Sequence, residues 1–147
     1  MKIVSPVSGR IKNVTELNDG VFSKNMMGVG FYVIGDDREV ISPINGKVTF
    51  IADTLHAVVI ENENYSVMVH VGLDTCHMKG APFTVQVKED QNVVAGQPLL
   101  KVDRKLIKAK GYDGSVIVIL MENKDQSLFS KLPFMVKAGK VILELKV

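Results

Sequence analysis

The chain has 147 residues, 46% of them hydrophobic and 23% charged, which predicts one globular domain over residues 1–147 and excludes a disordered chain. Its formal net charge of +2 argues against nucleic-acid binding, which requires a concentrated basic face. The single cysteine, Cys76, rules out an internal disulfide, and with no signal peptide and no membrane-length apolar run we expect a soluble, cytoplasmic protein, monomeric by default.

Short runs rich in Val, Ile and Phe, separated by turn residues, predict an all-β fold along the chain. The turn signals include residues 19–20, 45–46, 61–64, 80–82 and 113–114. Many short strands joined in this way favour an antiparallel β-sandwich or a barrel.

Two segments towards the C-terminus interrupt this β pattern. Residues 104–110 are mostly basic but contain Leu106 and Ile107, and we interpret them as a solvent-exposed edge strand or loop. Residues 124–132 contain neither Gly nor Pro, and we predict that they form the one short helix of the fold.

The sequence contains two internal echoes. Ser-Pro-Val-Ser-Gly at residues 5–9 returns as Ser-Pro-Ile-Asn-Gly at residues 42–46, and Ala-Gly begins both residues 95–100 and residues 138–143. Each echo places a turn just before a strand. The two echoes occur in the same order, so we predict two related half-sheets packed face to face.

Two of the three histidines, His56 and His70, flank a polar tetrad at residues 61–64 that we interpret as a hairpin turn. A turn centred near residues 62 and 63 places His56 opposite residue 69 or 70, with Cβ atoms about 4.5–5.5 Å apart. Both imidazoles would then project from one face, although a shift of one residue would separate them. The third histidine, His77, has no such partner and is interpreted as a loop residue.

A facing pair of imidazoles suits phosphoryl transfer, because a neutral imidazole is a good nucleophile near neutral pH and a second one can donate a hydrogen bond to the phosphoryl group. Thr54, two residues before His56 on the same strand face, would orient an imidazole through its hydroxyl. Asp74, near the end of the partner strand, would hold His70 in one tautomer.

The spacing of the histidines leaves two other interpretations open. The pair could be structural, with both rings hydrogen-bonded and inert, or it could begin a zinc site. Zinc needs a third and usually a fourth ligand, and the sequence offers neither His-x-His nor a second cysteine. We therefore predict no intrinsic metal site and no cofactor.

The motif Thr54-Leu55-His56-Ala57, the segment 69–75 and Lys79-Gly80 resemble the glucose-type IIA domain of the bacterial phosphoenolpyruvate-dependent sugar phosphotransferase system. Residues 5–9, 42–46 and 111–147 fit the same family, so the likeness covers nearly the whole chain. The resemblance implies an antiparallel β-sandwich, sometimes described as a barrel-sandwich hybrid.

The resemblance also implies a function for the paired histidines. His56 matches the histidine that accepts phosphoryl from the small carrier HPr and passes it to a cysteine on a IIB domain of a sugar permease, through which the carrier associates indirectly with the membrane. His70 matches the second histidine, which stabilises the phosphoryl group, and Thr54 and Asp74 match residues beside the site. At Leu55 the chain departs from the family pattern, in which Asn is common.

We expect the surface around the histidines to be apolar, because such a surface excludes water and accepts differently shaped partners. Val29, Phe31, Ala52 and Met68 are the candidates for an exposed patch that docks HPr and IIB, with core packing as the alternative for each. Two other functions stay open: a non-catalytic regulator that uses the same surface, and a zinc peptidase or lipoyl-type carrier, the latter with Lys79 as an imperfect attachment site.

Overall fold

The computed structural model describes residues 1–146, and strands account for most of its regular structure. The strands are β1 (Lys2–Val4), β2 (Gly9–Asn13), β3 (Gly28–Ile34), β4 (Glu39–Ile41), β5 (Gly46–Ile51), β6 (Ala57–Glu61), β7 (Ser66–Leu73), β8 (Phe83–Val85), β9 (Asn92–Val93), β10 (Pro98–Val102), β11 (Asp113–Met121), β12 (Met135–Val136) and β13 (Val141–Glu144). The helical elements are α1 (Arg104–Ala109) and the 3₁₀ turns η1 (Val14–Glu16), η2 (Phe22–Lys24), η3 (Thr75–Met78) and η4 (Gln126–Phe129).

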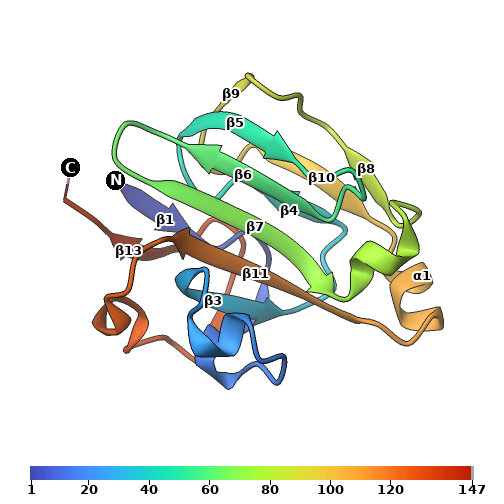
Figure 1. Ribbon diagram of the computed structural model, residues 1–147, viewed down its shortest axis with the longest axis horizontal. Helices are drawn as coiled ribbons and strands as arrows, with labels where there is room; N and C mark the ends of the chain where they lie inside the picture. Colours follow the sequence, from blue (N-terminus) through green and yellow to red (C-terminus); the bar gives the residue numbers. More distant parts are fainter. Residues whose placement is uncertain (147) are drawn as a thin grey trace.

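The strands form three antiparallel sheets. The largest has the order β12-β2-β3-β11-β7-β6-β5-β9, and the smaller ones have the orders β4-β10-β8 and β1-β13. Figure 1 shows β6, β7 and β11 side by side, with β4 and β10 behind them. The fold is therefore the predicted all-β antiparallel sandwich with one short helix. No helix among residues 1–146 is long and apolar enough to cross a membrane.

The core of the sandwich is built from alternate residues of the central strands. On β11, Val116, Val118 and Leu120 point into the inner core, whereas Ile117 and Ile119 belong to a second apolar cluster on the opposite face of the same sheet. The continuous apolar run of β11 is explained by this arrangement, because both of its faces are covered.

The two sequence echoes form equivalent structures. The Ser5 hydroxyl donates to the Val7 carbonyl at 2.7 Å, and the Ser42 hydroxyl donates to the Ile44 carbonyl at 2.8 Å. All four residues are fully buried. A buried hydroxyl needs a hydrogen-bond partner. In both copies the serine hydroxyl finds it in the carbonyl two residues later, and this bond stabilises the turn that precedes the next strand.

Each Ser-Pro turn is also paired with one of the Ala-Gly turns. The Gly139 N–H donates to the Ser5 carbonyl and the Gly96 N–H donates to the Ser42 carbonyl, both at 2.9 Å. The predicted duplication therefore appears in the structure as two copies of the same contact, in which a Ser-Pro turn accepts a hydrogen bond from an Ala-Gly turn.

The short helix is not where the sequence predicted it. Residues 104–110, interpreted as an edge strand or loop, contain α1, because the Asp103 carboxylate caps it by accepting from the Leu106 N–H and Ile107 is buried on its inner side. Residues 124–132 form only η4, where Asp125 caps a single 3₁₀ turn. The basic side chains of 104–110 therefore lie around a helix that Ile107 anchors to the core.

Candidate functional site

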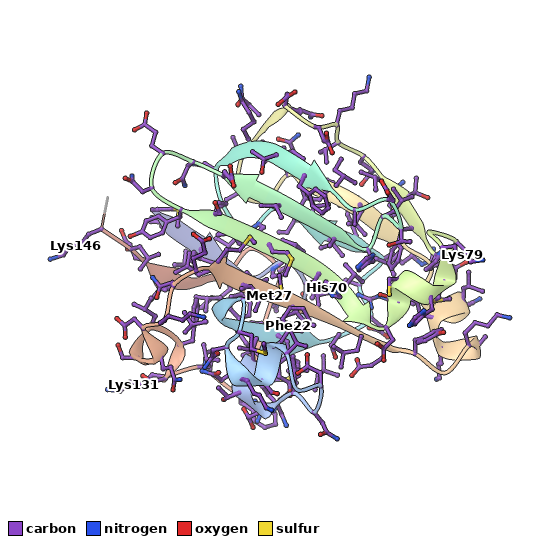
Figure 2. All side chains as sticks on the ribbon, in the orientation of Figure 1. Phe22, Met27, His70, Lys79, Lys131 and Lys146 are labelled. Carbon is purple, nitrogen blue, oxygen red and sulfur yellow. The ribbon has the colours of Figure 1, made fainter. Side chains whose placement is uncertain are left out.

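The second apolar cluster lies on the outer face of the large sheet. Strands β3, β6, β7 and β11 contribute one wall, and the segment that contains η1 and η2 lies over them. Its buried members are Val14, Leu17, Phe22, Tyr32, Ala57, Val59, Met68, Ile117 and Ile119. Figure 2 labels Phe22, which contacts His70 on β7, and Met27, which packs against the same cluster. The two histidines meet at the edge of this cluster.

The predicted hairpin exists, but its register differs from the prediction by one residue. The loop runs from Asn62 to Tyr65, whose carbonyl accepts from the Asn62 N–H at 2.9 Å, so His70 pairs with Ala57 rather than with His56. His56 lies one position earlier, and its carbonyl accepts from the Val71 N–H at 2.7 Å.

The imidazoles meet nevertheless, because His56 is in a turn and not in a strand. The Leu55 N–H donates to the Ala52 carbonyl at 2.8 Å, and Leu55 adopts a left-handed conformation with φ of 62°. That conformation is unusual for a bulky residue and reverses the chain just before β6. The strict alternation of a strand therefore does not apply to the side chain of His56.

The two imidazoles form a perpendicular pair. The ring centroids of His56 and His70 are 4.7 Å apart with an interplanar angle of 83°, and both side chains are partly exposed. The Thr54 hydroxyl lies 2.7 Å from Nδ1 of His56. This hydrogen bond engages Nδ1 and leaves Nε2 as the ring nitrogen of His56 that is available for chemistry.

Both histidines favour the neutral form. Burial lowers the pKa of His56, and a hydrogen bond to the Thr54 backbone opposes this only in part. Burial and the neighbouring His56 lower the pKa of His70 to about 4, although the Gly72 backbone and the Asp19 carboxylate favour its charged form. Nδ1 of His70 is buried and has no hydrogen-bond partner of good geometry among residues 1–146.

Comparison with known proteins relates this geometry to a family. The model of the family described as "phosphoenolpyruvate-dependent sugar phosphotransferase system, EIIA 1" matches residues 1–126. The chain belongs to this family.

Individual relatives agree with this assignment. The glucose-specific EIIA component of Bacillus cereus is 35% identical over 139 residues, which are 94% of this chain and 84% of the relative. The beta-glucoside-specific EIIBCA component of Bacillus subtilis is 40% identical over 140 residues, 95% of this chain, but the chain spans only 22% of that protein. The structure of the glucose permease IIA from Mycoplasma capricolum superposes with a TM-score of 0.84 at 29% identity, covering 97% of this chain and 94% of the other.

In this EIIA chain, Asp74 does not have the position that was predicted for it. Asp74 is exposed, adopts a left-handed conformation with φ of 61°, and its carboxylate makes no hydrogen bond within residues 1–146. The prediction that Asp74 fixes the tautomer of His70 is therefore wrong. The reason is that β7 ends at Leu73, so Asp74 belongs to the turn into η3 and no longer follows the strand face.

Asp19 is the carboxylate whose charge acts on His70, and the sequence reasoning missed it. Its two oxygens accept from the N–H groups of Phe22 and Ser23, each at 3.0 Å. Burial alone would raise the pKa of Asp19, but these hydrogen bonds outweigh it and the pKa is lowered. The Asp-Gly pair at residues 19–20 marks a turn, and that is the local signal the sequence offers for this segment.

The Asp19 segment places an aromatic ring against His70. The rings of Phe22 and His70 have centroids 5.1 Å apart and meet edge to face at 66°. The ammonium group of Lys124 donates to the carbonyls of Asn25 at 2.8 Å and Met26 at 3.3 Å, and so fastens the far end of the segment. His70 is thus held between His56 and an anchored phenylalanine.

The predicted docking patch is largely wrong. Val29 and Phe31 are 2% and 0% exposed and belong to the inner core, because alternation along β3 points them inward. Met68 is 5% exposed within the outer cluster, and Ala52 is half-buried beside it. The exposed apolar side chains of the covering segment are Val21 and Met26, at 44% and 63%.

Metal ligands are sparse in this EIIA fold. Within residues 1–146, no three side chains from His, Cys, Asp and Glu come close enough together to hold a metal ion. His56 and His70 are two potential ligands, and zinc sites in proteins use at least three.

Proposed function

We propose that this EIIA chain is a phosphoryl carrier in sugar uptake that accepts a phosphoryl group from phosphorylated HPr on His56 and passes it to a cysteine on a IIB domain. Residues 1–147 would act in the cytoplasm as a single IIA-type domain and as a monomer. The observation that supports this most is the pairing of His56 with His70 at 4.7 Å, with Nδ1 of His56 engaged by Thr54. In such an arrangement one ring nitrogen is free to attack.

The first step is an in-line displacement at phosphorus. With its proton on Nδ1 and directed at the Thr54 hydroxyl, neutral His56 presents the lone pair of Nε2. Nε2 forms the new P–N bond as the P–N bond to the histidine of HPr breaks, and that histidine keeps the electron pair. In the second step the IIB cysteine thiolate attacks the same phosphorus, the P–S bond forms, and the P–N bond to His56 breaks.

His70 serves as a hydrogen-bond donor to the phosphoryl oxygens. Its lowered pKa, about 4, keeps it neutral at physiological pH, so that one ring nitrogen carries a proton and no full charge traps the phosphoryl group. A donor of moderate strength suits a carrier, because the phosphohistidine must be stable enough to persist and reactive enough to be passed on.

Partner docking involves the covering segment. Val21 and Met26 are exposed apolar side chains on the segment that brings Phe22 to His70, and Ala52 lies in the turn that leads to His56. A partner that covers these side chains would exclude water from the transfer and reduce hydrolysis of the phosphoryl group.

The test is transfer of labelled phosphoryl from phosphorylated HPr to the purified chain. We expect an acid-labile, base-stable label that is abolished in His56→Ala and retained in His77→Ala, since His77 is an exposed histidine in η3. His70→Ala should accept some label but pass it to the IIB cysteine more slowly. Normal labelling of His56→Ala would refute the proposal.

A further inference from the structure

We propose that a basic hollow beside α1 binds the phosphate group of a small organic phosphate monoester, independently of the phosphoryl transfer at His56. The hollow has a volume of about 600 Å³ and is formed where the segment before β4, the start of β8, the end of β10 and the start of α1 meet. None of its lining residues belongs to the outer apolar cluster or to the histidine pair.

Positive charge dominates the walls of this hollow. Arg38, Lys101, Arg104 and Lys105 line it, against the two carboxylates Asp36 and Asp103. The Asp103 carboxylate is already used, since it accepts the Leu106 N–H at the start of α1. The side chains of Arg38, Lys101 and Lys105 are exposed and make no hydrogen bond or ion pair with any other residue in the described range, 1–146.

Arg104 gives the hollow a positive charge that is held in a fixed position. Its Nε donates to the Asp37 carbonyl at 2.9 Å, and its Nη1 donates to the Gly114 carbonyl, so the guanidinium plane is held by backbone on two sides. Its Nη2 is buried and has no partner within residues 1–146, and burial lowers its pKa against the pull of Asp36 and Asp37. Nη2 itself is closed to a ligand, but an anion in the hollow would offset the cost of burying the Arg104 charge.

The remaining walls fit the organic part of such a ligand. Ala81, Pro82 and Val102 contribute apolar surface, and Thr84 contributes a hydroxyl. Lysine and arginine side chains around a concave wall are typical of phosphate recognition, whereas a flat or convex basic face would suit a polyanion or a membrane surface. The size, the charge and the mixed lining therefore indicate a small phosphate ester rather than a polymer.

The experiment is a titration of the full ¹⁵N-labelled chain with glucose 6-phosphate, followed through backbone amide shifts. With glucose 6-phosphate we expect saturable shifts of the amides of residue 38 and residues 101–105. Inorganic phosphate should shift the same amides with weaker affinity, and glucose should shift none of them. Shifts centred on His56 and His70, or equal affinity for inorganic phosphate and the ester, would contradict this assignment.

Paired variants separate a built site from attraction to net charge. Lys101→Gln combined with Lys105→Gln should weaken binding at least about tenfold, because two of four cations are removed. Lys47→Gln combined with Lys88→Gln changes net charge equally on exposed lysines outside the hollow and should leave the affinity unchanged. Equal weakening by both double variants would overturn the proposal, and neither double removes a side chain with a described hydrogen bond.

Discussion

The two apolar clusters of this EIIA chain lie on opposite faces of the same strands, and they differ in what covers them. The inner cluster is enclosed mainly by other strands, with α1 and η4 adding Ile107 and Phe129, and the rings of Phe31 and Phe129 are 5.6 Å apart. Its buried members include no titratable residue. The outer cluster is covered by a segment with little regular structure, and at its edge lie His56 and His70. Both clusters arise because successive side chains along a strand point to opposite faces of the sheet.

This difference shows that one face of the sheet can provide the stable core while the other holds the candidate site. A face closed by strands can exclude water completely, which favours packing but prevents a partner from reaching a side chain. A face closed by an anchored segment lowers the pKa values of its histidines by burial and still leaves them partly exposed. We therefore expect substitutions on the two faces to change different measured quantities.

The largest contrast should come from the two phenylalanines. Phe31→Ala removes a fully buried ring from the inner core and should lower the free energy of unfolding by about 3–5 kcal/mol. Phe22→Ala removes a ring that is 7% exposed and packs beside the partly exposed His70, and should cost only about 1–3 kcal/mol. Urea denaturation of both variants measures the difference.

Phosphoryl acceptance should show the reverse order. Per folded molecule, Phe31→Ala should accept label from phosphorylated HPr at the normal rate, whereas Phe22→Ala should be slower because His70 loses its aromatic contact. If Phe31→Ala does not fold, Phe31→Leu and Phe22→Leu provide the same comparison. Equal loss of rate in both variants would show that the two faces are not functionally separate.

A smaller effect should appear in the pH dependence of stability. An unfolded histidine has a pKa near 6.5 and folded His70 has one of about 4, so between these values the unfolded chain binds more protons and stability falls as the pH falls. The loss contributed by His70 should reach about 3 kcal/mol by pH 4, with His56 adding in the same direction.

A histidine substitution tests that assignment. His70→Gln should make the fall in stability between pH 6.5 and 4 less steep than it is in the unsubstituted chain. Denaturation midpoints at several pH values would measure both slopes. A slope that is the same with and without His70 would mean that burial does not lower its pKa in solution.

The fold was largely readable from the sequence because it depends on alternation and turn chemistry. The Ser5 and Ser42 turns, the hairpin before His70 and the antiparallel class all follow from local residue types. The helix was misplaced because one capping residue, Asp103, decides between a basic loop and α1. A cap of this kind occupies a single position, and composition over a window does not reveal it.

The structure shows the predicted contact between the two histidine rings, whereas the residues around them differ from the prediction. The two histidines meet, although the register was off by one residue, because the left-handed turn at Leu55 releases His56 from the strand alternation. Whether Val29 and Phe31 face inward depends on the register of β3 in the sheet, which single-sequence patterns do not fix. The role of Asp19 depends on how its segment folds over the sheet, a tertiary feature.

The smallest expected effect concerns Asp19 and the two backbone N–H groups that it binds at η2. Asp19→Ala removes the acceptor of the Phe22 and Ser23 N–H groups and should lower the free energy of unfolding by about 0.5–2 kcal/mol. Asp125→Ala is a matched control, since Asp125 caps η4 by accepting the Ser127 N–H and is exposed. Only the Asp19 variant should also slow phosphoryl acceptance, because only its segment touches His70.

Asp19→Asn separates the charge of this residue from its capping. The amide keeps one of the two oxygen acceptors, so part of the lost stability should return, but the negative charge that favours protonated His70 is gone. The pKa of His70, measured by NMR titration of its ring, should therefore fall further in Asp19→Asn. An unchanged pKa with restored stability would reduce Asp19 to a structural cap, whereas a lowered pKa would place it among the groups that set the protonation of the histidine pair.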